Sequence, residues 1–508
     1  MRRFPRSWWP DWLDNRYYTI KRFISCLSPL ALVIAMMLYP GCSKLFDDGI
    51  NDEPRPLKAV DLGLPSGNLW ASQNLLADRP WALGGSFAWG ETHEIDDSCD
   101  YSFIVDGRLT AYNFEEERGV VDNRYILDPE DDAASALLGE EWRIPTKWDF
   151  DELKENCEWK ACSIKGICGY KFTSKENGNS IFIPSYKRGW FLAPPEEEYY
   201  YWTSCVSEYD CLDPIDYARC VGGDDFHERR RSRERGLYIR PVMSGRAPVE
   251  SITMKTADLS MTPGDNCRLG VVFSPRNALD RRISWSSGDE IVAFIDKDGK
   301  LTALFPGNTS VTALSISSGV STKTDVAVAD FIVPELVDLG LPSGTLWADR
   351  DIGALDVTDQ GLCFAFGEVH PKMTFSPDNY YGGKDYTPHS YLQQEHDAAT
   401  TIFGVGWKMP TPEMFAELVQ YCDISSTEDF TSRFKLVSKN NGNTLYLPEQ
   451  IYWTSLFEDY HGTPMGFGLC FYMYFAWQTG QLTTKTETKY CYNGLLVRPV
   501  FTPEGATH

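Results

Sequence analysis

Residues 60–71 read VDLGLPSGNLWA and residues 337–348 read VDLGLPSGTLWA, so one position differs between them: Asn68 against Thr345. Five further pairs of blocks recur in the same order, with insertions between them. They are FAWGETH (87–93) with FAFGEVH (364–370), DDAASALLGEEWRIPT (131–146) with HDAATTIFGVGWKMPT (396–411), YKFTSKENGNSIFIP (170–184) with FKLVSKNNGNTLYLP (434–448), YWTS (201–204) with YWTS (452–455), and GLYIRPV (236–242) with GLLVRPV (494–500). One domain is therefore used twice, over residues 57–244 and 334–503.

Each block has a local structural interpretation. LPSG combines Pro and Gly as a turn does, and residues 131–138 read as a short helix ended by Gly139. Thr146 and Thr411 stand where helix N-caps stand, and Pro412 suits a first helical turn. ENGN and NNGN join alternating runs into β-hairpins. The pattern predicts an α+β domain.

Two cysteines follow these helices at core spacing. Phe150, Leu153 and Cys157 share one face, and Phe415, Leu418 and Cys422 repeat that spacing. We interpret Cys157 and Cys422 as buried thiols rather than nucleophiles.

The middle segment, residues 247–330, has a different pattern. Short alternating runs such as ISWSS and VAFIDKDGKLTAL are separated by turns, with a hairpin turn expected at Asp298-Gly299. This pattern predicts an all-β, Ig-like sandwich.

Charge and cysteine use narrow the function classes. The net charge of −24 argues against a nucleic-acid partner. The basic run HERRRSRERG (227–236) is interleaved with Glu and is interpreted as a solvated loop. The chain has 14 cysteines but no CxxC pair with metal spacing, so neither a metal site nor another cofactor is expected.

The N-terminus resembles a bacterial lipoprotein signal. Basic residues precede the apolar run FISCLSPLALVIAMMLYPGC (23–42), which places residues 1–41 as a signal peptide and Cys42 as the lipidated residue. Residues 42–56 form an acidic tether ending in Pro. An uncleaved membrane anchor is the alternative, although Pro29 and Pro40 shorten the usable helix.

Together the repeated blocks resemble the major paralogous domain first described in Fibrobacter succinogenes, which is abundant in exported proteins of gut Bacteroidetes. The middle segment resembles a group 2 bacterial Ig-like domain. The resemblance implies two α+β, C-type-lectin-like domains with paired first and last strands, separated by an all-β Ig-like sandwich. It also implies a lipid-anchored, exported protein of the outer membrane or cell surface.

Shared carboxylates suggest two alternatives. Glu91 and His93, repeated as Glu368 and His370, could form an acid/base or metal-dependent enzyme site. The favoured interpretation is structural: buried Arg240 and Arg498 of the RPV motifs pair with Glu91 and Glu368, because an unpaired buried charge is costly. The predicted protein is therefore not an enzyme.

Binding to an extracellular glycan or protein is the preferred function, with a purely structural surface component as the alternative. Scaffold blocks agree between copies while the connecting segments differ, and such segments usually carry recognition. The two copies are thus expected to recognise different ligands. The candidate aromatic platforms are Trp190, Phe191, Tyr199 and Tyr200 in the first copy, and Tyr472 and Tyr474 in the second.

Overall fold

A computed structural model describes residues 54–95, 101–187, 197–207, 217–223, 226–382, 386–426, 433–476 and 481–503. The chain separates into two compact units, Met1–Arg246 and Ala247–His508. The predicted signal segment and Cys42 lie outside the described residues. Within the described residues, no helix combines the length and the apolar character needed to cross a membrane.

Both copies bring their first and last blocks into one sheet. In the first copy the strand order is β1 (Ala59–Asp61), β2 (Leu69–Ala71), β13 (Val242–Met243) and β5 (Trp142–Arg143). In the second it is β23 (Leu336–Asp338), β24 (Leu346–Ala348), β35 (Val500–Phe501) and β27 (Trp407–Lys408). The last strand pairs with the second strand of the opening hairpin, one strand further in than expected.

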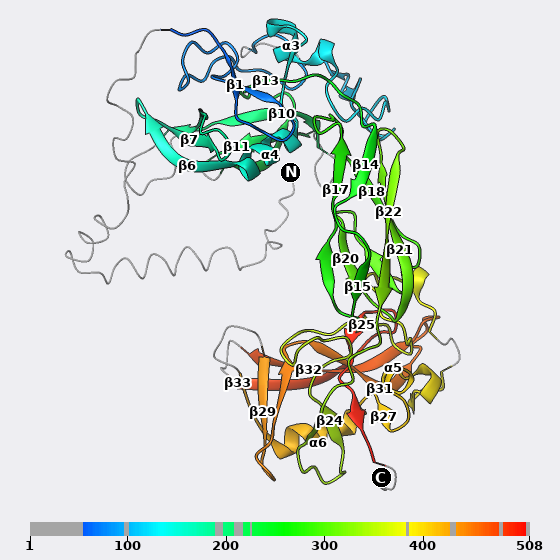
Figure 1. Cartoon of the computed structure of the whole chain (residues 1–508). Coiled ribbons are helices and arrows are strands. Elements are labelled where there is room, and N and C mark those ends of the chain that lie inside the picture. Colours follow the sequence, from blue (N-terminus) through cyan, green and yellow to red (C-terminus); the bar gives the residue numbers. More distant parts are fainter. Residues whose placement is uncertain are drawn as a thin grey trace, which may run out of the picture. The chain divides into compact units, whose positions relative to one another are not determined.

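The remaining elements of the first copy complete a mixed α+β architecture (Figure 1), in which α4 packs against β7, β10 and β11. They are β3 (Ile104–Val105), β4 (Arg108–Leu109), the 3-10 helix η1 (Pro129–Asp131), α3 (Ala133–Leu138), α4 (Lys147–Asn156), β6 (Cys157–Ile164), β7 (Ile167–Ser174), β8 (Ser180–Lys187), β9 (Glu197–Glu198), β10 (Tyr200–Val206), β11 (Tyr217–Gly222) and β12 (His227–Ser232). β12 takes in residues 227–232 of the basic run, so the predicted loop is wrong for this part of the run, which forms the edge strand of the sheet β10-β11-β12.

The second copy repeats this architecture with a longer sheet in the order β25-β34-β31-β32-β33. Its further elements are β25 (Cys363–Phe364), η2 (Pro377–Asn379), β26 (Ser390–Tyr391), η3 (Gln394–His396), α5 (Ala398–Phe403), α6 (Pro412–Tyr421), β28 (Cys422–Ser426), β29 (Arg433–Ser438), β30 (Thr444–Pro448), β31 (Ile451–Asp459), β32 (Phe467–Ala476), β33 (Gln481–Tyr490) and β34 (Leu495–Leu496).

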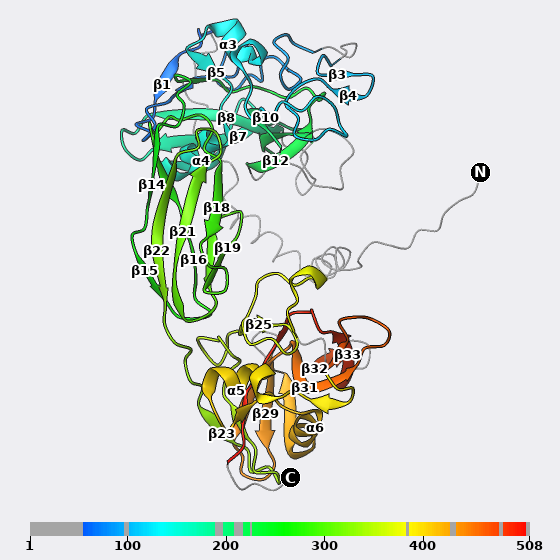
Figure 2. The ribbon, with the colours of Figure 1, turned by 90° about the vertical axis from the view of Figure 1, so that its right-hand side faces the viewer.

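The middle segment is entirely β, as predicted, and its strands run side by side in Figure 2. Three sheets have the orders β14-β17, β15-β22-β21-β18 and β16-β20-β19. The strands are β14 (Ser251–Met254), β15 (Leu259–Met261), β16 (Asn266–Arg268), β17 (Val271–Ser274), β18 (Ile283–Ser287), β19 (Ala293–Ile295), β20 (Lys300–Ala303), β21 (Gly307–Ser315) and β22 (Ser321–Val328). Gly299 turns the β19–β20 hairpin at φ +79°, which confirms the turn predicted from Asp298-Gly299.

The helix starts follow the predicted capping residues. Thr146 forms a capping box with Asp149, and the Thr411 side chain accepts a hydrogen bond from the Met414 N–H. Asp132 caps α3, so this helix begins slightly later than expected and ends at Gly139. The capping confirms how the WRIPT and WKMPT blocks lead into α4 and α6.

The repeated blocks hold one another in place, which explains why VDLGLPSG occurs twice. In the first copy, the side-chain amides of Asn177 and Asn179 donate to the carbonyl of Asp61, at 3.1 and 2.8 Å. In the second, Asn441 and Asn443 donate in the same way to the carbonyl of Asp338, at 2.9 and 2.7 Å. We call this arrangement the asparagine clamp.

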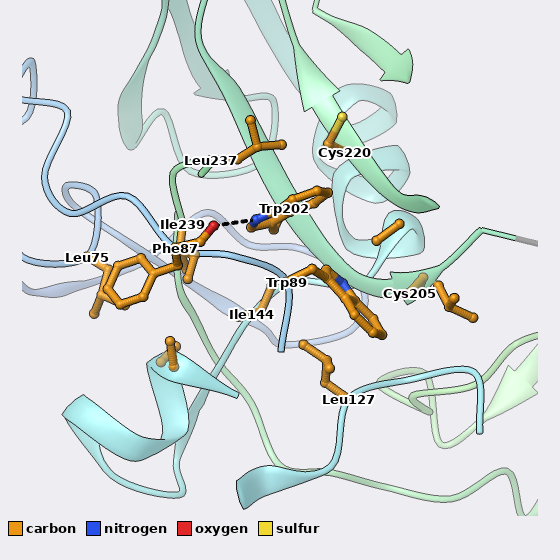
Figure 3. Packing of buried hydrophobic residues seen from close by; sticks show 14 of the residues in the cluster. Leu75, Phe87, Trp89, Leu127, Ile144, Trp202, Cys205, Cys220, Leu237 and Ile239 are labelled. Atoms are coloured by element: carbon orange, nitrogen blue, oxygen red, sulfur yellow. Dashed lines mark hydrogen bonds between the residues drawn. The ribbon is translucent and has the colours of Figure 1, made fainter. Parts of the chain in front are cut away.

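The YWTS tryptophans belong to the cores. Figure 3 shows Trp202 and Trp89 together near the centre of the first core, with Trp202 Nε1 donating to the Phe87 carbonyl at 2.7 Å. Trp453 of the second copy donates in the same way to the Phe364 carbonyl at 2.8 Å. Each tryptophan thus ties the YWTS strand to the FAWGE or FAFGE block.

Candidate functional site

The two RPV arginines are fully buried, but neither pairs with the predicted glutamate. Arg498 Nε lies 2.6 Å from Asp351 Oδ1, and its Nη1 donates to the Ala348 carbonyl at 3.2 Å. The predicted Glu368–Arg498 pair is therefore wrong. Asp351 lies three residues after β24, the strand that pairs with β35.

Arg240 differs from its counterpart. It donates to the carbonyls of Ala71 and Phe182, and within the described part of the chain no carboxylate pairs with it. The Glu91–Arg240 pair is thus also wrong. Asn74 stands where the second copy has Asp351, so a neutral amide replaces the carboxylate. Burial lowers the pKa of Arg240 to about 10.

Glu91 and Glu368 hold loops instead. Glu91 accepts hydrogen bonds from the backbone N–H and the hydroxyl of Ser102, at 2.8 and 2.6 Å. Glu368 accepts from the Tyr381 N–H and pairs with Lys372 Nζ, both at 2.5 Å. Two buried carboxylates with the same task in both copies favour a structural role.

The histidines beside them point to the same interpretation. His93 Nδ1 lies 3.8 Å from Glu91 Oε2 and is well exposed. His370 instead packs edge-on against Phe305, with ring centroids 4.5 Å apart. Among the described residues, no group of three His, Cys, Asp or Glu side chains is placed to hold a metal ion. The two Glu–His pairs therefore do not share one geometry.

The first copy's aromatic candidates are mostly unavailable as platforms. Trp190 and Phe191 lie outside the described residues. Tyr199 is buried and packs edge-on against Tyr238, so its proposed binding role is wrong. Tyr200 is half-buried, and the Arg231 guanidinium lies 4.4 Å from its ring centroid.

The second copy's aromatic candidates alternate as predicted. Phe471 and Met473 are buried in the core, whereas Tyr472 and Tyr474 lie on the opposite face and stack with centroids 5.6 Å apart. Lys485 of β33 lies over the Tyr472 ring at 5.8 Å. This face of β32 and β33 offers an aromatic surface to solvent.

A cleft of about 1110 Å³ opens elsewhere on the second copy, and we call it the α6 cleft. The LPSG turn, β26, β27 and the first turn of α6 line it, contributing among others Ser343, Tyr391, Lys408, Glu413 and Met414. These residue types join an apolar floor to a polar rim, as small-ligand sites do.

The carboxylates of the cleft already have partners within the chain. Glu417 accepts from the Ser343 N–H and hydroxyl at 2.8 and 2.6 Å, and Glu413 accepts from the Tyr391 hydroxyl at 3.0 Å. Asp397 accepts from the N–H groups of Thr400 and Met409, and burial raises its pKa. Burial lowers the pKa of Lys408.

In the first copy, the residues equivalent to Lys408 and Met414 are Arg143 and Asp149, and these two form an ion pair. Arg143 donates to both oxygens of Asp149, at 2.7 and 3.2 Å, and Asn68 donates to Asp149 at 2.7 Å. Burial acts to raise the pKa of Asp149, but Arg143 and Thr146 lower it below its usual value. The aligned WRIPT and WKMPT blocks contain part of this difference, because Arg143 in one is Lys408 in the other.

Comparisons with solved structures and curated proteins give short or weak likenesses. Domains 4 and 5 of the S-layer protein SbsC match with a TM-score of 0.16 and 13% identity, over 31% of this chain and 90% of that one. Invasin, a bacterial integrin-binding protein, matches with a TM-score of 0.14 and 10% identity, over 58% of this chain and 57% of that one. TM-scores this low carry no argument about fold or function.

An alpha-L-arabinofuranosidase of Bifidobacterium longum subsp. longum is 31% identical over 70 residues. The match spans 14% of this chain and 7% of that enzyme's length, so it does not assign the enzyme's activity to this protein. The model of the bacterial Ig-like domain (group 2) matches residues 248–326. The middle of the chain is thus a group 2 bacterial Ig-like domain.

Proposed function

We propose that this protein is a non-enzymatic cell-surface lipoprotein that binds an extracellular glycan or protein. Two C-type-lectin-like domains would carry recognition, and the Ig-like domain would hold them apart. The α6 cleft is the observation that carries this proposal, because it is a preformed concave site on a domain whose repeated blocks lock together.

In each copy the first and last blocks lie in one sheet, which supports the C-type-lectin-like part of the proposal. β2 pairs with β13 and β24 pairs with β35, so each copy begins and ends in the same small sheet. The resemblance to the major paralogous domain implies paired first and last strands; here the last strand pairs with the second strand, in the same sheet as the first. The segments that connect the repeated blocks can then vary in sequence without disturbing the sheet that joins the two ends of each copy.

Binding by the complete chain tests the function. The purified full-length protein would be screened on an array of host and plant glycans and in pull-downs with host extracellular proteins. We expect saturable binding to at least one class of these ligands. A well-folded chain that binds none of them would contradict the proposal and favour the structural-component alternative.

Lipid anchoring at Cys42 has its own test. A Cys42→Ala variant is expected to leave the membrane fraction, because acylation at that thiol is the proposed attachment to an outer membrane. Retention of the full-length variant in the membrane would favour an uncleaved anchor instead.

A further inference from the structure

Asp149 is the centre of a buried hydrogen-bond network in the first copy. Besides Asn68 and Arg143, it accepts from the backbone N–H and the hydroxyl of Thr146, at 2.6 and 2.8 Å. One carboxylate thus satisfies donors from the LPSG block, from β5 and from the start of α4.

In the second copy the donors remain but the carboxylate is missing. Met414 replaces Asp149, while Thr345, Lys408 and Thr411 replace Asn68, Arg143 and Thr146. The side-chain amino group of Lys408 makes no hydrogen bond or ion pair with any residue the structure describes, although Asp397 lies near enough to act on its charge. An amino group on the wall of an open cleft is therefore left without a partner.

We propose that a ligand carboxylate pairs with Lys408 in the α6 cleft, and that an acidic saccharide presents it. This inference rests on the proposed binding function and narrows it to one copy and one ligand class. Lys408 would pair with the carboxylate, as the equivalent Arg143 of the first copy pairs with Asp149 at 2.7 Å.

The rim of the cleft favours a saccharide over a polyanion. Glu413 and Glu417 would repel further negative charges, but their remaining lone pairs can accept hydrogen bonds from hydroxyl groups. Tyr391 is 49% exposed, and its hydroxyl is held by Glu413, so its ring is fixed at the rim. A ligand with one carboxylate and many hydroxyl groups matches both features.

Calorimetric titration of the full chain tests the proposal with two disaccharides. Cellobiouronic acid carries one carboxylate, and cellobiose has a hydroxymethyl group in its place. We expect the acid to bind at least about tenfold more tightly, since a charge-assisted hydrogen bond contributes that much. Acetyl-dialanine, a carboxylate without a sugar, is expected to bind no better than cellobiose.

Two variants locate the site. Lys408→Met removes the amino group, and Met414→Asp supplies the carboxylate that the ligand would bring. Each is expected to weaken binding of the acid at least about tenfold. Lys439→Met, which changes an exposed lysine outside the cleft lining, is the matched control and should bind like the unmodified chain.

Unchanged binding by both cleft variants would overturn the inference while leaving the surface-binding function intact. Equal binding of acetyl-dialanine through Lys408 would overturn the saccharide assignment. If the chain binds other array ligands but not cellobiouronic acid, this inference alone is overturned. If the chain binds no array ligand, the proposed function is overturned. A higher unfolding temperature for Met414→Asp would support the new internal ion pair.

Discussion

Asn74 and Asp351 occupy the same place in the two copies, yet they leave a buried arginine in different surroundings. Asp351 forms an ion pair with Arg498 at 2.6 Å, whereas Arg240 is held by carbonyl oxygens. A guanidinium can be satisfied by carbonyls at the closing strand, since it offers donors in several directions. The expectation that a buried arginine pairs with a carboxylate therefore holds for Arg498, which pairs with Asp351, and fails for Arg240.

Asp351→Asn is expected to lower the free energy of unfolding of the second copy by about 3 kcal/mol, because Arg498 loses its only charged partner within the described residues. Asp423→Asn, in the exposed pair with Lys439, is the control and should change it by less than about 1 kcal/mol. Urea unfolding measures both. Equal effects of the two substitutions would show that the buried pair contributes no more than the exposed one.

Buried thiols give a second residue-scale prediction. Burial raises the pKa of Cys205, Cys220 and Cys491 to about 12, so almost none of each thiol is ionised at pH 8. Iodoacetamide should leave all three unmodified in the native protein and modify them after unfolding in urea. Peptide mass spectrometry measures the modified fraction of each cysteine. Rapid labelling of these cysteines in the native protein would contradict the assigned burial.

At the scale of elements, much of the fold was predictable because the repeated blocks are local. Turn residues, helix caps and the Asn-Gly hairpins act over a few residues, and each was confirmed where the chain is described. Cys157 and Cys422 were also confirmed as buried. The arginine partners and the α6 cleft depend on segments distant in sequence, so single motifs could not predict them.

Substitutions can test how much the asparagine clamp stabilises each copy. Asn443→Ala in the second copy and Asn179→Ala in the first each remove one hydrogen bond to the carbonyl of the VDLG turn. We expect each to lower the free energy of unfolding of its own copy by about 1 kcal/mol. Denaturant unfolding of each variant checks this, and an effect in one copy only would show that the two clamps are not equivalent.

The Arg143–Asp149 pair predicts a pH dependence for the first copy. Because the folded-state pKa of Asp149 is lowered, its stabilisation is complete above the unfolded pKa of about 3.9 and is lost as pH falls through the lower folded pKa. Asp149→Asn should therefore lower stability by about 3 kcal/mol at pH 7 and by less at pH 3. Unfolding free energies at both pH values test this, and an equal loss at both would contradict the assigned pKa shift.

At the scale of the whole molecule, one domain design is used twice around a group 2 bacterial Ig-like domain. Interlocked blocks keep the two scaffolds alike, while Arg143 is paired with Asp149 in the first copy and the equivalent Lys408 lines the α6 cleft in the second. A duplicated domain can diverge in this way without losing its fold, because the clamp lies outside the exchanged network and Thr411 still caps α6 although Met414 replaces Asp149.

The central claim is that the two copies share a scaffold but differ in binding, and the stoichiometry of ligand binding to the complete chain tests it most directly. Titration with cellobiouronic acid should saturate at one molecule per chain, since the account places the open site in the second copy. Saturation at two equivalent molecules per chain would contradict the account, because the first copy would then bind despite its buried Asp149.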